Sequence, residues 1–146
     1  MTRFRGRYDY TVDGKGRLNI PAKWRKQLSP DAEDTFVVCR APGGCLWAYP
    51  QDEWEKFEEK MESMPAGRDS DRIQRMIHST LTDSVLDKQG RITLSPHQMQ
   101  MAGIGKNICL IGRRSYVEVW DAERFEQYVG DGGDFDEIYY SAVSQM

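Results

Sequence analysis

The sequence predicts a mostly β fold with short helices, built from two tandem copies of one unit. One observation is a repeated turn: residues 13–17 read Asp-Gly-Lys-Gly-Arg, and residues 87–91 read Asp-Lys-Gln-Gly-Arg. Another is that both turns lie between strand-like segments and are followed by a short helix marked by a proline. One unit alone could bury little apolar surface, so the repeat predicts two units that share a core.

The first unit begins with a strand, because Tyr8, Tyr10 and Val12 alternate with polar residues. The strand is expected over residues 7–12, and a second one follows the turn over residues 17–20. A helix is then expected over residues 21–28, since proline suits the first helical turn. This helix should bury Trp24 and Leu28 and point three cations outward, namely Lys23, Arg25 and Lys26.

Two more strands, residues 36–39 and 45–49, are expected to complete the first unit together with a closing helix from Pro50. That helix carries apolar residues on one face and glutamates elsewhere. The apolar face consists of Trp54, Phe57, Met61 and Met64. Such a stripe is most simply part of the core, and the acidic face should point away from any anionic partner.

A bridge between the units follows the break at Pro65-Ala66-Gly67. Asp69 or Ser70 is expected to cap a new helix there. Its apolar stripe is formed by Ile73, Met76, Ile77 and Leu81. Helical periodicity over this stretch predicts an ordered bridge rather than a flexible linker.

The second unit repeats the order of the first in a shorter form. Its expected strands cover residues 84–86, 108–111 and 116–120, and Phe125 and Tyr128 match Trp54 and Phe57 in the closing helix. Its short helix, residues 96–102, contains no lysine or arginine. The glycine-rich and acidic composition after Val129 predicts a mobile C-terminal tail.

Composition narrows the class of protein. No apolar run approaches the roughly 20 residues that span a bilayer, and residues 1–5 lack the apolar stretch of a signal peptide. Cys39, Cys45 and Cys109 form no Cys-x-x-C pair, which argues against a disulfide framework or a zinc knuckle. We therefore expect a cytoplasmic protein that does not bind membranes.

The charges are unevenly distributed along the chain. Residues 1–28 contain eight lysines and arginines against two aspartates, whereas residues 121–146 contain seven acids against one arginine. A net charge of −3 thus conceals a basic N-terminal segment that could face phosphates. His78 and His97 have no partner at a spacing typical of a catalytic or metal site, so we expect no enzyme activity, metal, cofactor or small-molecule substrate.

The repeated turn has a physical interpretation. Gly16 and Gly90 can supply the positive φ angle of a tight turn, and Asp13 and Asp87 can accept hydrogen bonds from the backbone within it. Each aspartate can also pair with the arginine that follows. A guanidinium held in this way loses little entropy when it contacts a phosphate or a guanine.

These residues resemble a known family. The Phe4-Arg5-Gly6 start, the two Asp-x-x-Gly-Arg turns and the strands that follow are similar to the MraZ family of bacterial transcriptional regulators. The resemblance covers roughly residues 4 to 130 and implies two tandem AbrB-like swapped-hairpin units that form a shared, double-split β-barrel, with a bridging helical segment. The implied divisions are a first repeat (5–60), the bridging helical segment (61–81), a second repeat (82–130) and an acidic C-terminal tail (131–146).

The resemblance also implies a function. The family consists of regulators that associate with the nucleoid and bind short direct repeats of double-stranded DNA in the promoter of their own division and cell-wall gene cluster, as ring-shaped homo-oligomers. The implied DNA-binding residues are Arg5, Lys15, Arg17, Lys88 and Arg91, and the implied turn organisers are Asp13, Gly16, Asp87 and Gly90. The first unit should attract phosphates more strongly, because only its short helix is basic.

Two other functions fit the same residues. The chain could be an AbrB-like antitoxin whose tail embraces a toxin. It could also be an oligomeric adaptor that never touches DNA, with Arg17 and Arg91 acting only as ion-pair braces of their turns.

Overall fold

The structure, a computed structural model, describes residues 3–130 and 132–146. Asp131, where the expected acidic tail begins, lies outside these residues, as do Met1 and Thr2. The elements up to the bridge are β1 (Phe4–Thr11), β2 (Arg17–Asn19), α1 (Ala22–Arg25), the 3-10 helix η1 (Pro30–Ala32), β3 (Thr35–Arg40), β4 (Leu46–Pro50), α2 (Gln51–Glu62) and α3 (Arg68–His78). The elements after it are β5 (Thr82–Val85), β6 (Arg91–Thr93), α4 (Pro96–Met101), β7 (Asn107–Arg114), β8 (Val117–Asp121), α5 (Ala122–Gly130) and α6 (Phe135–Val143).

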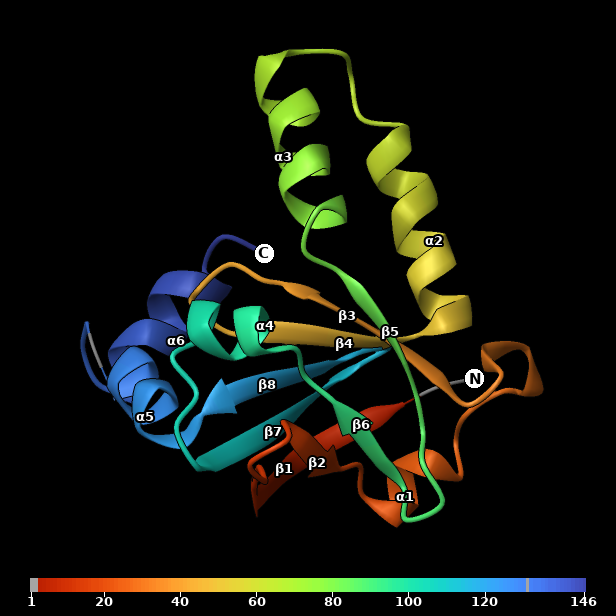
Figure 1. Ribbon diagram of the computed structural model, residues 1–146. Coiled ribbons are helices and arrows are strands. Elements are labelled where there is room, and N and C mark those ends of the chain that lie inside the picture. The colour runs from red at the N-terminus through yellow and green to blue at the C-terminus, as the bar shows by residue number, and fades with distance from the viewer. Residues whose placement is uncertain (1–2, 131) are drawn as a thin grey trace.

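The two units interleave in one six-stranded antiparallel sheet (Figure 1). Its order is β1-β7-β8-β4-β3-β5, and β2 pairs with β6 in a separate two-stranded sheet. The order reads the same from both edges when β1 is matched with β5, β7 with β3, and β8 with β4. Each unit therefore contributes an outer strand that pairs with a strand of the other unit, which confirms the expected tandem organisation.

One core is shared by both units. Leu18 of β2 lies opposite Ile92 of β6, and both side chains are buried in the same cluster as Ile20 and Leu94. Trp24 of α1 closes one end of this core by packing on Phe4. Among the described residues the strands form two separate sheets around this core, so the double-split arrangement does not close into one continuous hydrogen-bonded barrel.

The strands that flank each turn separate immediately after it. The first turn is closed by the Asp13 N–H, which donates to the Arg17 carbonyl at 3.0 Å. Beyond that bond, the Val12 N–H donates to the carbonyl of Lys106, directly before β7, and Leu18 pairs with Ile92 of β6. This separation is what exchanges strands between the units.

Two helical expectations were wrong in detail. α1 ends at Arg25 instead of reaching Leu28, because the next turns are closed by tighter bonds, from Gln27 to the Trp24 carbonyl and from Leu28 to the Arg25 carbonyl. α3 has Gly67 as its N-cap residue, and neither Asp69 nor Ser70 caps it. The Ser70 hydroxyl instead donates back to the Gly67 carbonyl at 3.0 Å.

Helices α2 and α3 project together from the large sheet (Figure 1). Trp54 and Met61 of α2 and Ile77 of α3 are buried against Val37 and Tyr49 of the sheet. The C-terminal segment, where composition suggested a mobile tail, contains α6. Asp134 caps α6 by accepting the Glu137 N–H at 2.9 Å, and no proline or glycine interrupts the segment that follows.

The described residues include three buried cysteines, no membrane-spanning helix and no cluster of metal ligands. All three cysteines are free and buried, and burial raises the pKa of Cys39 and Cys45 to about 12, so these thiols stay protonated at neutral pH. In residues 3–130 and 132–146, no helix is long and apolar enough to cross a membrane. Within the same residues, no three histidine, cysteine or acidic side chains gather as metal ligands.

Gln98 of α4 is a buried polar residue that the sequence analysis did not single out. Its side chain is 0% exposed and joins three segments. The Nε2 group donates to the carbonyls of Val38 and Thr80, at 3.1 and 3.0 Å, and Oε1 accepts the Ser95 N–H at 3.0 Å. Together with Ser95 it forms the capping box of α4.

Gln98→Ala is therefore expected to lower the free energy of unfolding by about 2–3 kcal/mol, because it leaves buried backbone groups without partners. Urea unfolding followed by circular dichroism measures this loss. Gln100→Ala is the matched control, since Gln100 lies on the same helix and is exposed. Equal losses in the two variants would show that the Gln98 network does not stabilise the fold.

Candidate nucleic-acid interface

The first turn holds its arginine through one carboxylate. Asp13 Oδ1 accepts the backbone N–H groups of Lys15 and Arg17, both at 2.9 Å, and Oδ2 accepts Arg17 Nε at 2.7 Å. Gly16 closes the turn by donating to the Asp13 carbonyl at 3.0 Å, and its φ is +79°. The described hydrogen bonds of Arg17 use Nε and the backbone N–H, which leaves both Nη groups available to a ligand.

The second turn reproduces this geometry. Asp87 Oδ1 accepts the N–H groups of Gln89 and Arg91, both at 2.9 Å, and Oδ2 accepts Arg91 Nε at 2.8 Å. The φ of Gly90 is +78°. The same five-residue pattern thus produces the same local structure twice, in two different surroundings.

These hydrogen bonds shift the carboxyl groups in one direction. The pKa of Asp13 falls to about 2, chiefly because the Arg17 N–H stabilises the carboxylate, with the Arg17 guanidinium and the Lys15 N–H adding to it. The pKa of Asp87 is lowered by the equivalent bonds, led by the Arg91 N–H. Both groups are therefore ionised throughout the neutral range.

The stability of the turns should therefore depend on pH. Because the folded-state pKa of Asp13 lies below the value of about 3.9 expected in an unfolded chain, its stabilising effect is complete above about pH 4 and is lost as pH falls toward 2. Carboxyl-carbon NMR titration measures this pKa directly. Arg17→Ala should raise it only partly, because the largest cause is the backbone N–H of residue 17. An ordinary pKa for Asp13 in the native protein would contradict the turn geometry.

The β2–β6 pair places both arginines on one face. Arg17 lies opposite Thr93 and Asn19 lies opposite Arg91, so alternation directs the two arginines to the same side of this ladder. Arg91 Nη1 is 3.9 Å from Asp13 Oδ2, the oxygen that also pairs with Arg17. The side chains of Arg17 and Arg91 are 35% and 23% exposed, so both remain accessible to a ligand.

Each turn is supported by the short helix of the other unit. A Cβ on Gly90 would lie 2.5 Å from Cζ of Arg25, and Nε of Arg25 donates to the Ile20 carbonyl at 2.9 Å. Across the repeat, Met99 approaches Gly16 in the same way. The expectation that Arg25 points freely outward was therefore wrong: it is half-buried and packs under the second turn. The only signal in the sequence was that Arg25 and Met99 are separated by the same 74 positions as the turns.

The other residues expected to bind DNA lie in different parts of the structure. Lys15 and Lys88 are exposed within their turns. Arg5 is exposed on β1 opposite Arg113, about 25 Å along the strand from Asp13 at the rise of an extended chain. Arg5 nevertheless lies beside α1, since its carbonyl accepts Nε1 of Trp24 at 3.3 Å.

The basic and acidic ends of the chain are not kept apart in space. Arg7 of β1 pairs with Asp9 at 3.0 Å and with Glu126 of α5 at 2.7 Å, and its guanidinium lies over the Phe125 ring. These carboxylates raise the pKa of Arg7 above its ordinary value. Arg7 is thus engaged by carboxylates within the chain.

The interleaved sheet and the twin arginine turns define a duplicated swapped-hairpin protein. Residues 3–76 and 80–135 match the family described as "MraZ protein, putative antitoxin-like". The chain belongs to the MraZ family.

Relatives with the same name are similar over nearly their whole length. The transcriptional regulator MraZ of Oenococcus oeni is 40% identical over 137 residues, covering 92% of this chain and 93% of the relative. The transcriptional regulator MraZ of Lactobacillus delbrueckii subsp. bulgaricus is 39% identical over 137 residues, with the same coverage. That of Lachnoclostridium phytofermentans is 36% identical over 131 residues, covering 90% of each chain.

Proposed function

We propose that this protein is a sequence-specific DNA-binding transcriptional regulator that contacts double-stranded DNA through its two Asp-x-x-Gly-Arg turns. The observation that carries the proposal is the pair of partly exposed arginines, Arg17 and Arg91, on one face of the β2–β6 ladder, each held at Nε by the aspartate of its turn. Guanidinium groups in this state suit bidentate contacts with guanine or phosphate. The relatives' name, transcriptional regulator, supports the same function.

The proposed roles are divided among the positive residues. Arg17 and Arg91 read bases, whereas Lys15 and Lys88 at the tips neutralise phosphates. Arg5 contacts the backbone of the duplex farther from the turns. Asp13, Gly16, Asp87 and Gly90 set the angle at which the arginines meet the DNA.

The target we propose is a run of short direct repeats in the promoter of the protein's own division and cell-wall gene cluster, bound by a ring-shaped homo-oligomer. One chain offers a small contact area for specific recognition, and linked copies raise affinity through effective concentration. The protein would then act in the cytoplasm, on the nucleoid.

A gel shift with the protein's own upstream region tests the proposal. Specific binding is expected, with an affinity that falls steeply as salt rises, by a slope of about −0.9 per neutralised phosphate. A scrambled duplex of equal length is the control. Failure to shift either duplex at low salt would overturn the proposal and favour the adaptor function, in which the arginines only brace their turns.

A further inference from the structure

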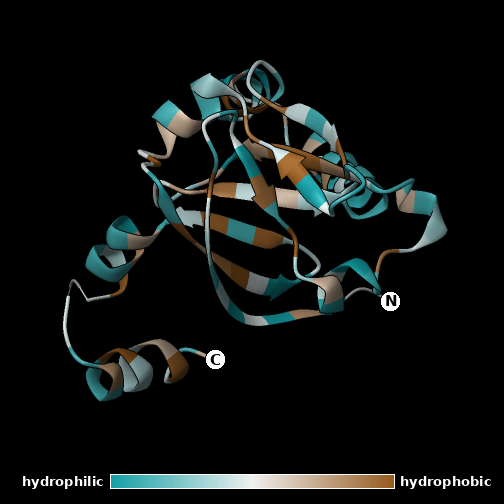
Figure 2. Cartoon of the chain, turned by 60° about the horizontal axis from the view of Figure 1, so that its bottom comes forward, coloured by the Kyte–Doolittle hydropathy of each residue, from teal (hydrophilic) through white to brown (hydrophobic). Residues whose placement is uncertain are grey.

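Helix α6 exposes a continuous apolar stripe. Spacing of three and four residues places its apolar side chains on one face, namely Phe135, Ile138, Tyr139, Ala142 and Val143. No residue of α6 is buried, and Phe135 is 77% exposed. Figure 2 shows the helix standing apart from the body of the chain. A nine-residue helix is marginal in water on its own, so α6 is expected to need a surface to pack on.

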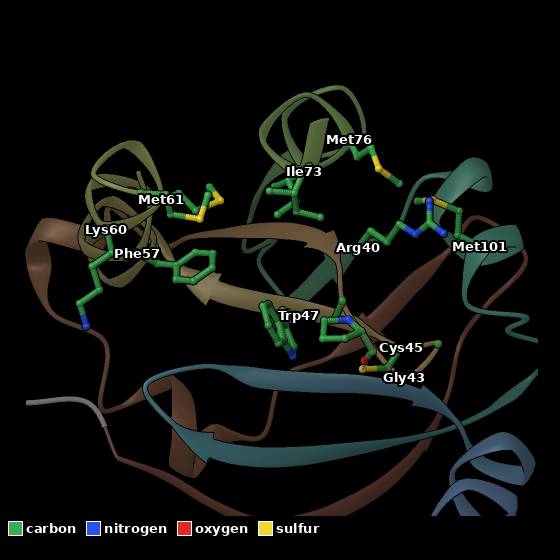
Figure 3. Close-up of a pocket in the computed structure, with 15 residues that line it drawn as sticks. Arg40, Gly43, Cys45, Trp47, Phe57, Lys60, Met61, Ile73, Met76 and Met101 are labelled. Carbon is green, nitrogen blue, oxygen red and sulfur yellow. Dashed lines mark hydrogen bonds between the residues drawn. The ribbon is translucent and has the colours of Figure 1, made fainter. Parts of the chain in front are cut away.

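The same chain offers an uncovered apolar groove. It has a volume of about 700 Å³ and lies between the α2–α3 pair and the strands β3 and β4. In Figure 3, Ile73 and Met76 project from α3 toward it, Phe57 and Met61 line it from α2, and Trp47 lies on the sheet side. Ile73 and Met76 are 41% and 43% exposed. Methionine-rich grooves of this kind adapt to amphipathic helices.

The charges of the helix complement those of the groove. Arg40 and Lys60 are the charged residues that line it, and both are exposed. The first turn of α6 carries Asp136 and Glu137 beside its cap Asp134, and α6 contains no lysine or arginine.

We propose that α6 of one copy of this protein docks in the groove of a second copy. Gly132 and Gly133, at φ of +98° and +125°, turn the chain between α5 and α6, and in Figure 2 α6 stands apart from the body of its own chain. A second copy can fill the groove without any change in this turn. Since helix and groove are different surfaces, the contact is head-to-tail and extends from copy to copy.

The proposal deepens the self-association suggested above by naming its interface. DNA has no part in the contact, so its test is independent of whether the turns bind DNA. Because the contact is head-to-tail, α6 and the groove can be disabled in separate chains and then tested in a mixture.

The experiment uses two full-length variants, Ile73→Asp in the groove and Ile138→Asp in α6. Both positions are more than 40% exposed, so the fold should survive, and circular dichroism checks it. Sedimentation velocity is expected to show concentration-dependent assembly of the native chain and monomers for each variant alone. An equimolar mixture should give a dimer with one copy of each variant, because α6 of the groove variant still fits the intact groove of the other.

Tyr140→Asp is the matched control, since Tyr140 is 71% exposed on the other face of α6, and it should assemble like the native chain. A native chain that stays monomeric, or variants that assemble as it does, would overturn the proposal. So would monomers in the mixture, which indicate docking within one chain, or self-association of Ile73→Asp alone, which indicates pairing of α6 with α6. If either aspartate variant loses its native spectrum, Met76→Glu and Tyr139→Glu replace the pair with the same expected outcomes.

Discussion

Arg17→Ala is expected to abolish sequence-specific DNA binding and to leave the fold intact. A bidentate base contact contributes about 1–3 kcal/mol, and several linked copies lose the same contact together, so the affinity should fall by at least about 100-fold. The fold should survive because the Arg17–Asp13 pair is partly exposed to solvent, by 35% and 36%, and ion pairs near the surface contribute about 0–1 kcal/mol. Fluorescence anisotropy with the upstream duplex measures the affinity.

Three controls distinguish direct contact of Arg17 with DNA from a role in stabilising its own turn. Arg91→Ala should weaken binding less, because the Arg91 side chain is 23% exposed against 35% for Arg17, and its Nη1 also lies 3.9 Å from Asp13 Oδ2. Asp13→Ala should cause a smaller loss than Arg17→Ala, since it disorders the turn without removing the guanidinium. Circular dichroism of Arg17→Ala decides the remaining alternative, because an unfolded variant would favour the bracing function over DNA contact.

Gly16→Ala is expected to lower the free energy of unfolding by about 3 kcal/mol or more, from backbone strain and overlap together. The φ of +79° disfavours any side chain, and a Cβ at this position would lie 2.4 Å from the Leu94 carbonyl oxygen. Relief requires the backbone at Leu94, directly after β6, to move, which breaks the bond that Leu94 N–H donates to the Gly16 carbonyl at 2.8 Å. Urea unfolding measures the loss.

Two other glycines provide graded controls for this variant. Gly90→Ala meets the same strain at φ +78°, but its overlap is with the flexible guanidinium of Arg25, so a loss of about 1–2 kcal/mol is expected. Gly14→Ala should change stability by less than about 0.5 kcal/mol, since nothing lies within 4 Å of its added Cβ. A loss for Gly16→Ala no larger than that for Gly90→Ala would show that the backbone at Leu94 moves away at little cost.

The contrast between Gly16 and Gly90 shows where sequence reasoning stops. Both glycines occupy the same position in the repeated turn, yet one packs against a backbone carbonyl and the other against an arginine side chain. Arg25 illustrates the same limit, since its helical position was predicted but its contact with the second turn was not. A residue 65 positions away supplies that contact, and no local periodicity reports it.

The sequence by itself determined the duplication, the order of the elements and the internal geometry of both turns. The turn geometry depends on groups within about five residues of one another, so the pattern Asp-x-x-Gly-Arg gives the same hydrogen bonds in both copies. Only the tertiary structure decided that each outer strand pairs with the other unit, that Asp13 contacts both Arg17 and Arg91, and that Glu126 engages Arg7. The physical reason is that strand exchange and ion pairing depend on which distant segments the shared core brings together, and that choice is made by the packing of the whole chain.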